Sequence, residues 1–241
     1  MATKFSALTT RVRRRLLEEK RSDTQRLFWS DEELLDHLID GAKDMWGAIL
    51  DLGQEHFLTI DTTNVTQAAD ATALSGVPSD VFRVHMLEPA DTTSTGSHKN
   101  VIYIPRDLNS VEFQRARAQS SQDPNSGQIV YFTLINAGHP VAAPLIQVAP
   151  KLSSAVTLRL IYIPGLGTIT ENSNNPIPGE SDNALIAYAV AYARAKERED
   201  RSPDPNWLAI YATEKQNLLV RLTPRQSQEL PVVTAFFEDM W

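Results

Sequence analysis

The sequence predicts an α+β protein: an α-helical core of about four helices, with an inserted antiparallel β region and an extended C-terminal tail. Three observations support this fold class. Apolar residues recur with helical spacing towards both ends of the chain, short β-branched and aromatic runs fill residues 55–165, and turn residues separate those runs. Because the strands form one block without a βα repeat, parallel pairing is not expected. We therefore divide the chain into N-terminal core helices (1–54), a β insertion (55–165), C-terminal core helices (166–230) and an apolar tail (231–241).

The composition limits the classes of protein to which the chain can belong. It has 241 residues, 42% of them hydrophobic, a net charge of −7 and no cysteine. The acidic balance argues against a surface that grips nucleic acid throughout. The lack of thiols excludes disulfides, thiolate nucleophiles and cysteine-bound zinc. No window resembles a membrane span or a signal peptide, so we expect a soluble protein made in the cytoplasm, without a membrane partner.

A first helix is predicted over about residues 5–20. Its apolar residues form a narrow stripe, and basic residues lie along the flank of that stripe. The stripe is Phe5, Leu8, Val12 and Leu16, and the flank is Lys4, Arg11, Arg14 and Arg15. A solvated charged face is the commoner reason for such a flank, and contact with phosphate groups is the alternative.

A second helix has the clearest start in the chain, because Ser30 and Glu33 form a capping box. The apolar residues that follow cover an arc of about 160°, wide enough to require at least two packing neighbours. The opposite face is acidic and carries Asp36, Asp40, Asp44 and Asp51. Paired carboxylates can bind metal or act as acids and bases, but these lie four residues apart on a solvated face, so a charged outer surface is favoured.

The β insertion contains six runs that predict strands. They are Phe57–Ile60, Val81–Met86, Val101–Ile104, Ile129–Ile135, Leu145–Val148 and Val156–Ile163. One helix interrupts them, opened by Asn109 with Glu112 three residues later, and it contains the basic segment Arg115–Arg117. The polar loops Ala90–Asn100 and Ala118–Gly127 are predicted to be mobile and to dock a partner.

The helical core resumes with a central helix over residues 182–199. Apolar and small residues cover nearly every side of it, which predicts a buried helix, and Ser181 or Asp182 is expected to cap its start. A rigid turn at Pro203–Asn206 then begins the last helix, whose buried stripe is predicted to be Trp207, Tyr211, Leu218 and Leu222.

The tail, Pro231–Trp241, is apolar although the chain as a whole is acidic. Its apolar residues recur in pairs every four residues, which would place them on one side of a short helix. A helix of that length needs a supporting surface, so the tail either folds back on the helical core or docks on another subunit or protein. The candidate docking residues are Val233, Phe236, Phe237, Met240 and Trp241.

Residues that could carry chemistry form no recognisable motif. The histidines show no metal-ligand spacing, and the chain has neither a phosphate-binding loop nor a nucleophile elbow. No catalytic residue, metal site or cofactor is therefore predicted.

The order of these features resembles that of tailed-bacteriophage head-to-tail adaptors, also called head completion or connector proteins. The segment Trp29–Leu35, continuing to Ala42, matches a helix of that family, and Val77–Asp80 matches the start of a strand. The segment Ile177–Tyr188 matches the proline-led helix by which the chain returns to the core. The resemblance covers nearly the whole chain, although the region Asp107–Pro150 is longer than in compact members.

The resemblance implies a virion structural protein without enzymatic activity or cofactor. It would form a ring, commonly dodecameric, beneath the portal, where it joins capsid to tail and lines the DNA exit channel. Its partners would be the portal protein, neighbouring copies, tail or tail-terminator proteins, and genomic DNA that passes without tight binding. The site would be the neck of the virion, after assembly in the bacterial host cytoplasm, and the tail would dock on portal or on a neighbour.

Charge on the first two helices suggests how neighbouring subunits meet. The basic flank of one subunit is expected to oppose the acidic face of the next, with the residues Arg11, Arg14, Arg15, Asp36, Asp40 and Asp44. A different class of function, a nucleic-acid-binding regulator that uses the helix with Arg11–Arg15 and the segment Arg115–Arg117, is the alternative, and an undetected hydrolase is the third.

Overall fold

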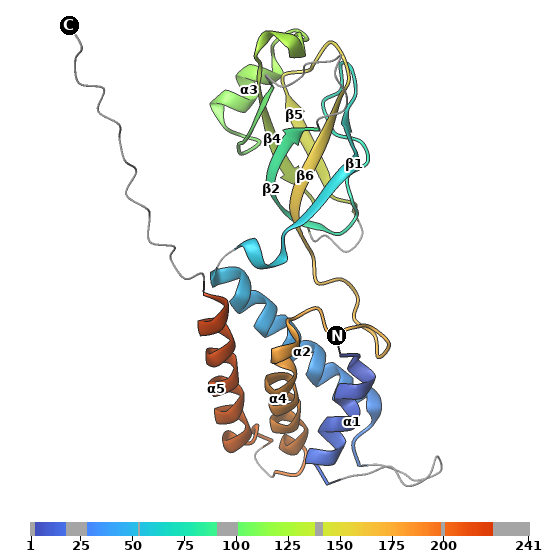
Figure 1. Cartoon of the computed structure of the whole chain (residues 1–241), viewed down its shortest axis with the longest axis vertical. Helices are drawn as coiled ribbons and strands as arrows, with labels where there is room; N and C mark the ends of the chain where they lie inside the picture. The colour runs from blue at the N-terminus through green and yellow to red at the C-terminus, as the bar shows by residue number, and fades with distance from the viewer. Residues whose placement is uncertain are drawn as a thin grey trace, which may run out of the picture. The chain divides into compact units, whose positions relative to one another are not determined.

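The computed structural model describes residues 3–17, 28–52, 54–90, 101–137, 142–198 and 201–223. The chain divides into two compact units: residues 1–53 with 169–241, here called the helical unit, and residues 54–168, here called the β unit. Helices make up the helical unit and strands make up most of the β unit, as expected, so the predicted α+β class is confirmed (Figure 1).

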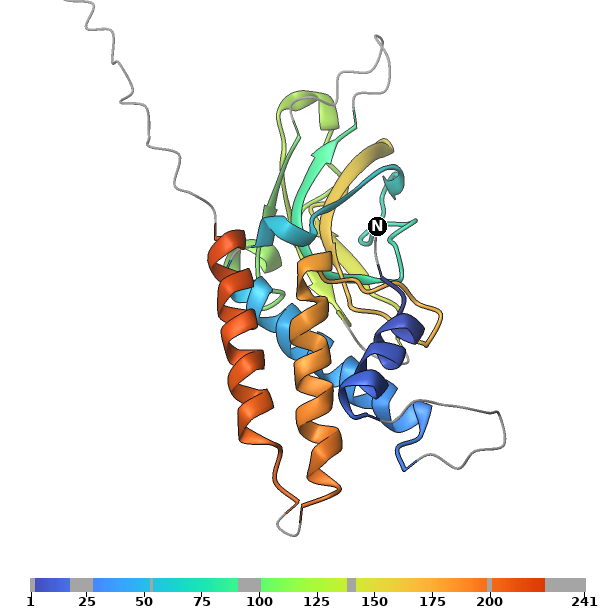
Figure 2. The same cartoon turned by 60° about the horizontal axis from the view of Figure 1, so that its bottom comes forward.

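The helical unit contains α1 (Phe5–Arg15), α2 (Asp31–Leu52), η3 (Gly179–Ser181), α4 (Asp182–Ala195) and α5 (Pro205–Leu222). Helix α4 packs against α1, α2 and α5, and α2 also contacts α1 and α5. In both views α4 and α5 run side by side and α2 crosses them diagonally (Figures 1 and 2). The prediction of a buried central helix is confirmed, because most residues of α4 are buried.

Side chains fix the starts of two helices, one of them at the predicted cap Ser30 and the other within the predicted turn at Pro203–Asn206. The Ser30 hydroxyl accepts a hydrogen bond from the Glu33 amide at 3.0 Å, and the Asp204 carboxylate accepts one from the Asn206 amide at 2.9 Å. Each bond satisfies a backbone donor that the first helical turn leaves unpaired. The carboxylate of Glu33 binds Lys196 at 2.9 Å and so ties α2 to the end of α4.

Helix α2 presents its apolar arc to the neighbouring helices, with Leu34, Leu38, Ala42, Met45 and Ile49 buried. Gly41 is also buried, and a Cβ atom built at this position would lie 3.1 Å from the ring of Tyr188 in α4. Glycine therefore allows α2 and the aromatic face of α4 to approach closely.

The β unit begins with η1 (Gln54–Phe57), and its described residues form six strands in two sheets. One sheet has the order β1–β6–β2 and the other β3–β4–β5. The strands are β1 (Thr59–Gln67), β2 (Val81–Pro89), β3 (Ile102–Pro105), β4 (Ile129–Ile135), β5 (Leu145–Ala149) and β6 (Val156–Pro164). Alternate residues of both sheets, including Leu158 and Leu160 of β6 and Val130 and Phe132 of β4, share one hydrophobic core.

Strands β3 and β4 run parallel, so the expectation of a purely antiparallel β region is wrong. Ile102 pairs with Ile129, and Pro105 pairs with Phe132. The chain between these strands carries α3 (Val111–Arg117) and η2 (Pro124–Ser126). A crossover of this length is what parallel pairing requires, and the helix interrupting the strands was its signal in the sequence.

The start of α3 and the loop after it also differ from expectation. Ser110, one residue after the expected Asn109, caps α3 by accepting a hydrogen bond from the Phe113 amide at 3.2 Å. The loop predicted to be mobile at Ala118–Gly127 is paired into the unit, because the Gln122 amide donates to Lys151 at 2.9 Å and the Ser153 amide donates to Gln122 at 2.8 Å. Most of the other loop, Ala90–Asn100, lies outside the described residues.

Candidate interaction surfaces

The described parts of the chain contain no group of three histidine, aspartate or glutamate side chains that could hold a metal ion. The residues that can be assigned a role are instead those of charged and apolar surfaces.

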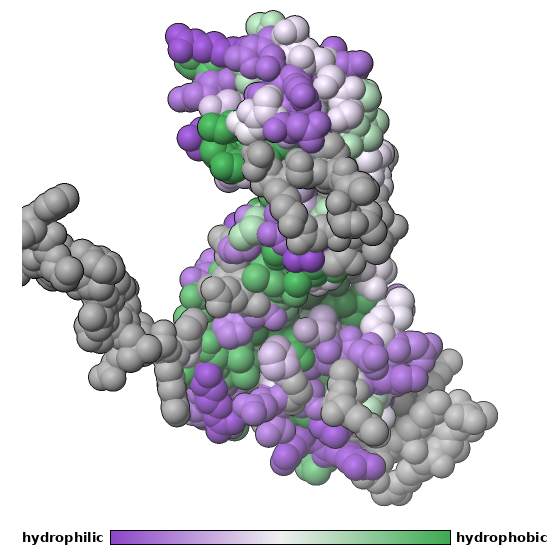
Figure 3. Space-filling view, turned by 45° about the horizontal axis from the view of Figure 1, so that its top comes forward, coloured by the Kyte–Doolittle hydropathy of each residue, from purple (hydrophilic) through white to green (hydrophobic). Residues whose placement is uncertain are grey.

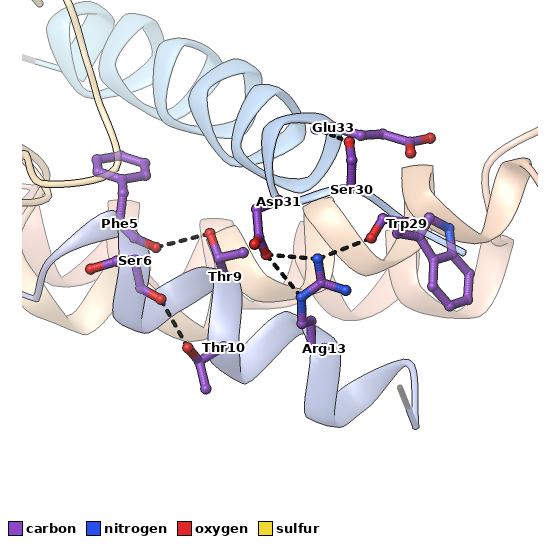
Figure 4. Close-up of polar contacts among 9 residues, drawn as sticks. All are labelled: Phe5, Ser6, Thr9, Thr10, Arg13, Trp29, Ser30, Asp31 and Glu33. Carbon is purple, nitrogen blue, oxygen red and sulfur yellow. Dashed lines mark hydrogen bonds and ion pairs between the residues drawn. The ribbon is translucent and has the colours of Figure 1, made fainter. Parts of the chain in front are cut away.

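Of the four arginines of α1, Arg13 is buried and the other three are exposed, and Arg11 is paired within its own chain. Arg13 is only 6% exposed, and its guanidinium donates to the Asp31 carboxylate at 2.9 and 2.6 Å and to the Trp29 carbonyl at 2.9 Å (Figure 4). Arg11 lies 3.2 Å from the Asp182 carboxylate. Arg14 and Arg15 are exposed and make no ion pair within the described residues.

Arg13 is a residue that the sequence interpretation missed. It lies four residues after Thr9, which lies four after Phe5, and all three are buried on the same side of α1. Helical spacing of four residues was therefore the available signal. Its bonds tie the end of α1 to the start of α2.

Asp182 is buried and collects three partners at the start of α4. Its carboxylate accepts hydrogen bonds from Thr3 at 2.6 Å and from Asn175 at 3.1 Å, besides the pair with Arg11. The Ser181 hydroxyl accepts from Asn175 at 3.0 Å. The expectation that Ser181 or Asp182 caps α4 through its side chain is wrong: the N-cap residue Ser181 makes no side-chain cap bond, and both side chains instead hold α1 and the preceding loop.

The acidic face of α2 is partly neutralised within the chain. Asp44 lies 2.6 Å from Lys215 of α5 and accepts a hydrogen bond from the Tyr211 hydroxyl, and Asp40 lies 3.2 Å from Lys43. Burial raises the pKa of Asp44, but the hydrogen bonds from Lys215 and Tyr211 outweigh it and hold the pKa below its ordinary value. Asp36 is exposed.

An aromatic cluster lies where α2, α4 and α5 meet. The ring centre of Tyr188 is 4.5 Å from that of Tyr192 and 5.0 Å from that of Tyr211, and His37 lies 6.0 Å from Tyr192. Burial lowers the pKa of His37, although the nearby carboxylates of Glu33, Asp40 and Asp36 act in the opposite direction. The cluster therefore favours a neutral imidazole.

Comparison with known protein families identifies the chain. Residues 3–234 match the family described as SU10 adaptor protein. The chain belongs to the SU10 adaptor protein family. The suspected kinship with head-to-tail adaptors is thus confirmed, and the chain is a bacteriophage adaptor, of a family of structural proteins and not of enzymes. No curated protein matches it significantly.

Membership of this family implies a component of the virion neck that interacts with portal and tail components. In the parts of the chain that are described, no helix is long and apolar enough to cross a bilayer. The candidate docking residues Val233, Phe236, Phe237, Met240 and Trp241 lie outside the described residues.

Apolar side chains of the adaptor reach the surface of both units among polar ones (Figure 3). On the outer face of the β1–β6–β2 sheet, Ile60 and Met86 flank Ile161 in register and are 57% and 42% exposed. On the other sheet the paired residues Ile102 and Ile129 are 58% and 46% exposed. These exposed apolar residues lie next to one another on each sheet.

Proposed function

We propose that this adaptor assembles into a closed ring beneath the portal, joins the capsid to the tail and lines the channel through which DNA leaves. The match to the adaptor family over residues 3–234 is the observation that carries the proposal. Twelve copies is the stoichiometry that the resemblance implies, and tail or tail-terminator proteins would bind the opposite side of the ring. No catalytic step, cofactor or membrane contact is part of this function.

The charge distribution supports side-by-side packing of subunits. Arg14 and Arg15 of one copy would face Asp36 and Asp40 of the next. Arg11 and Asp44 have partners in their own chain, and Asp40 also pairs with Lys43 of its own helix. Each exposed ion pair is worth only about 0–1 kcal/mol, so the contribution depends on its repetition around the ring. Ring formation is therefore expected to weaken as salt concentration rises.

The negative net charge suits a channel wall along which DNA slides. A net charge of −7 gives little counterion-release affinity for duplex DNA. For the alternative function, a nucleic-acid-binding regulator, the helix with Arg11–Arg15 offers mainly Arg14 and Arg15, because the guanidinium of Arg13 is buried and that of Arg11 is paired.

The mass of the assembly tests the proposed ring. Light scattering of the full chain with and without purified portal, at low and high salt, should show an oligomer that portal stabilises and salt weakens. A strict monomer under all four conditions would refute the proposed ring. Tight binding of duplex DNA that is lost in Arg14→Ala and Arg15→Ala would favour the regulator instead.

The apolar tail is proposed to dock on the portal or on a neighbouring subunit. A chain that ends at Leu230 is expected to keep its melting temperature and circular dichroism within error, and to lose attachment to portal-bearing capsids. If that truncation unfolds or aggregates the isolated protein, the tail belongs to its own core and the docking role is refuted.

A further inference from the structure

In the described residues, the two sheets of the β unit are bridged by backbone pairing along one edge but not along the opposite edge. On the bridged side, the chain after β1 connects the two sheets, because Ser75 pairs with Thr66 of β1 and Ala73 pairs with Gln147 of β5. On the other side the terminal strands β2 and β3 approach each other but belong to different sheets. In the described strand order they are not hydrogen-bonded neighbours, so a seam runs between them.

This seam holds a cleft of about 410 Å³, within the range of volumes that ligand-binding clefts have. Its lining combines Phe82, Arg83 and Val84 of β2, Pro105, Arg106 and Asp107 at the end of β3, and Phe132, Thr133 and Leu134 of β4. Val84, Phe132 and Leu134 belong to or pack against the main core, so the floor of the cleft is the hydrophobic core itself.

The rim of the cleft carries more positive than negative charge. Arg83 and Arg106 are exposed and come from β2 and from the end of β3, and among the described residues of the lining Asp107 is the one carboxylate. The guanidinium of Arg106 lies 5.9 Å from the centre of the Tyr131 ring and donates to the Pro105 carbonyl at 3.1 Å. An apolar floor beneath two arginines fits a segment that carries aromatic and acidic residues together.

The C-terminal tail of this same chain has that chemistry. Phe236 and Phe237 are followed directly by Glu238 and Asp239, and no lysine or arginine occurs after Arg225. Residues 224–241 can span up to roughly 60 Å when extended, which allows one copy to reach another.

We propose that the seam between β2 and β3 binds the C-terminal tail of a neighbouring copy, with the Phe236–Phe237 pair over the apolar floor and Glu238 and Asp239 at Arg83 and Arg106. The inference rests on the proposed ring, because it requires adjacent copies, and it assigns the tail to the neighbour and not to the portal. A contact from the tail of one subunit to the cleft of the next is heterologous, so it repeats around a ring.

Cysteine cross-linking tests this contact, because the chain has no cysteine of its own. Full-length Thr133→Cys, in the cleft, is mixed with full-length Ala235→Cys, beside the phenylalanines, and oxidised mildly. Full-length Glu112→Cys, exposed on α3, replaces Thr133→Cys in the matched control. We expect the disulfide between different chains to form at least about tenfold more in the cleft pair than in the control pair, because docking raises the effective concentration of the thiols. Equal yields would overturn the proposal, as would a disulfide found only within one chain that carries both Thr133→Cys and Ala235→Cys.

Charge reversal gives a second test that does not depend on thiol geometry. Arg83→Glu with Arg106→Glu should lower the cross-linking yield by about three- to tenfold, and Glu238→Lys with Asp239→Lys in the partner copy should restore it. Failure of either step would refute the assigned pairing. If light scattering detects rings but no cross-link forms, this inference is wrong and the proposed function still stands. If no ring forms at all, the proposed function itself is refuted.

Discussion

Arg13 offers the sharpest test of how the helical unit is held together. Three consecutive arginines end α1, and only Arg13 is buried, so its neighbours are matched controls in the same helix. Replacing Arg13 by alanine removes two bonds to Asp31 and one to the Trp29 carbonyl. Arg14→Ala and Arg15→Ala remove the same charge and side-chain bulk from exposed positions.

The stability that Arg13→Ala is expected to lose depends on how deeply the partners of Arg13 are buried. A fully buried ion pair broken on one side costs about 3–5 kcal/mol, but Asp31 is largely exposed and can be rehydrated. The Trp29 carbonyl, on a residue that is itself buried, loses a charged donor, which costs about 1–3 kcal/mol. We expect a total of about 2–3 kcal/mol, and a fall in melting temperature of roughly 4–12 °C for a chain of this size.

Far-ultraviolet circular dichroism during thermal or denaturant unfolding measures the effect, because the helical unit supplies most of the helical signal. Arg14→Ala and Arg15→Ala should change the stability by no more than about 0.5 kcal/mol. Arg13→Lys should recover only part of the loss, because an ammonium group cannot reproduce the forked contact with Asp31. If Arg13→Ala is as stable as Arg14→Ala, the structural role given to Arg13 is wrong.

Three further predictions concern glycine packing, the loop after α3 and pH. Gly47→Ala should stabilise the protein by about 0.5–1 kcal/mol, since the added Cβ in α2 meets no atom within 4 Å. Gly41→Ala should not stabilise it, because the added Cβ lies 3.1 Å from the Tyr188 ring, and equal changes in denaturation midpoint for the two variants would contradict this reasoning. Deleting Ser120–Ser126 should lower the melting temperature of the β unit, because it removes the backbone bonds to Lys151 and Ser153 and the buried Pro124, and an unchanged melting curve would restore the mobile-loop interpretation. The pKa of His37 lies below its ordinary value of 6.5 in the folded chain, so the stability gained from the neutral imidazole is fully present above pH 6.5 and is lost as the pH falls below that value. His37→Gln should flatten this part of the curve of stability against pH, and an identical curve in the variant would exclude His37 as the cause.

Local signals in the sequence determined most of the elements. The capping box at Ser30, the turn at Asp204 and the apolar runs of the six strands depend on residues within a few positions of one another, and the structure has a helix or strand at each. The family resemblance could also be found from the sequence, because it rests on the order of such elements along the chain. The buried central helix was predictable because its small apolar residues leave no polar face.

Tertiary structure decided which residues become partners. Arg11 meets Asp182 across 171 positions, Asp44 meets Lys215 across 171, and the arginine that is buried differs from its exposed neighbours only by its position on the helix. The parallel pairing of β3 with β4 and the open seam beside β2 follow from how the sheets pack. Periodicity and capping indicate the local conformation of a segment, because they depend on residues within a few positions of one another. Pairing, burial and strand order depend instead on which distant segments meet, and the free energy of these contacts is gained only once the chain has folded.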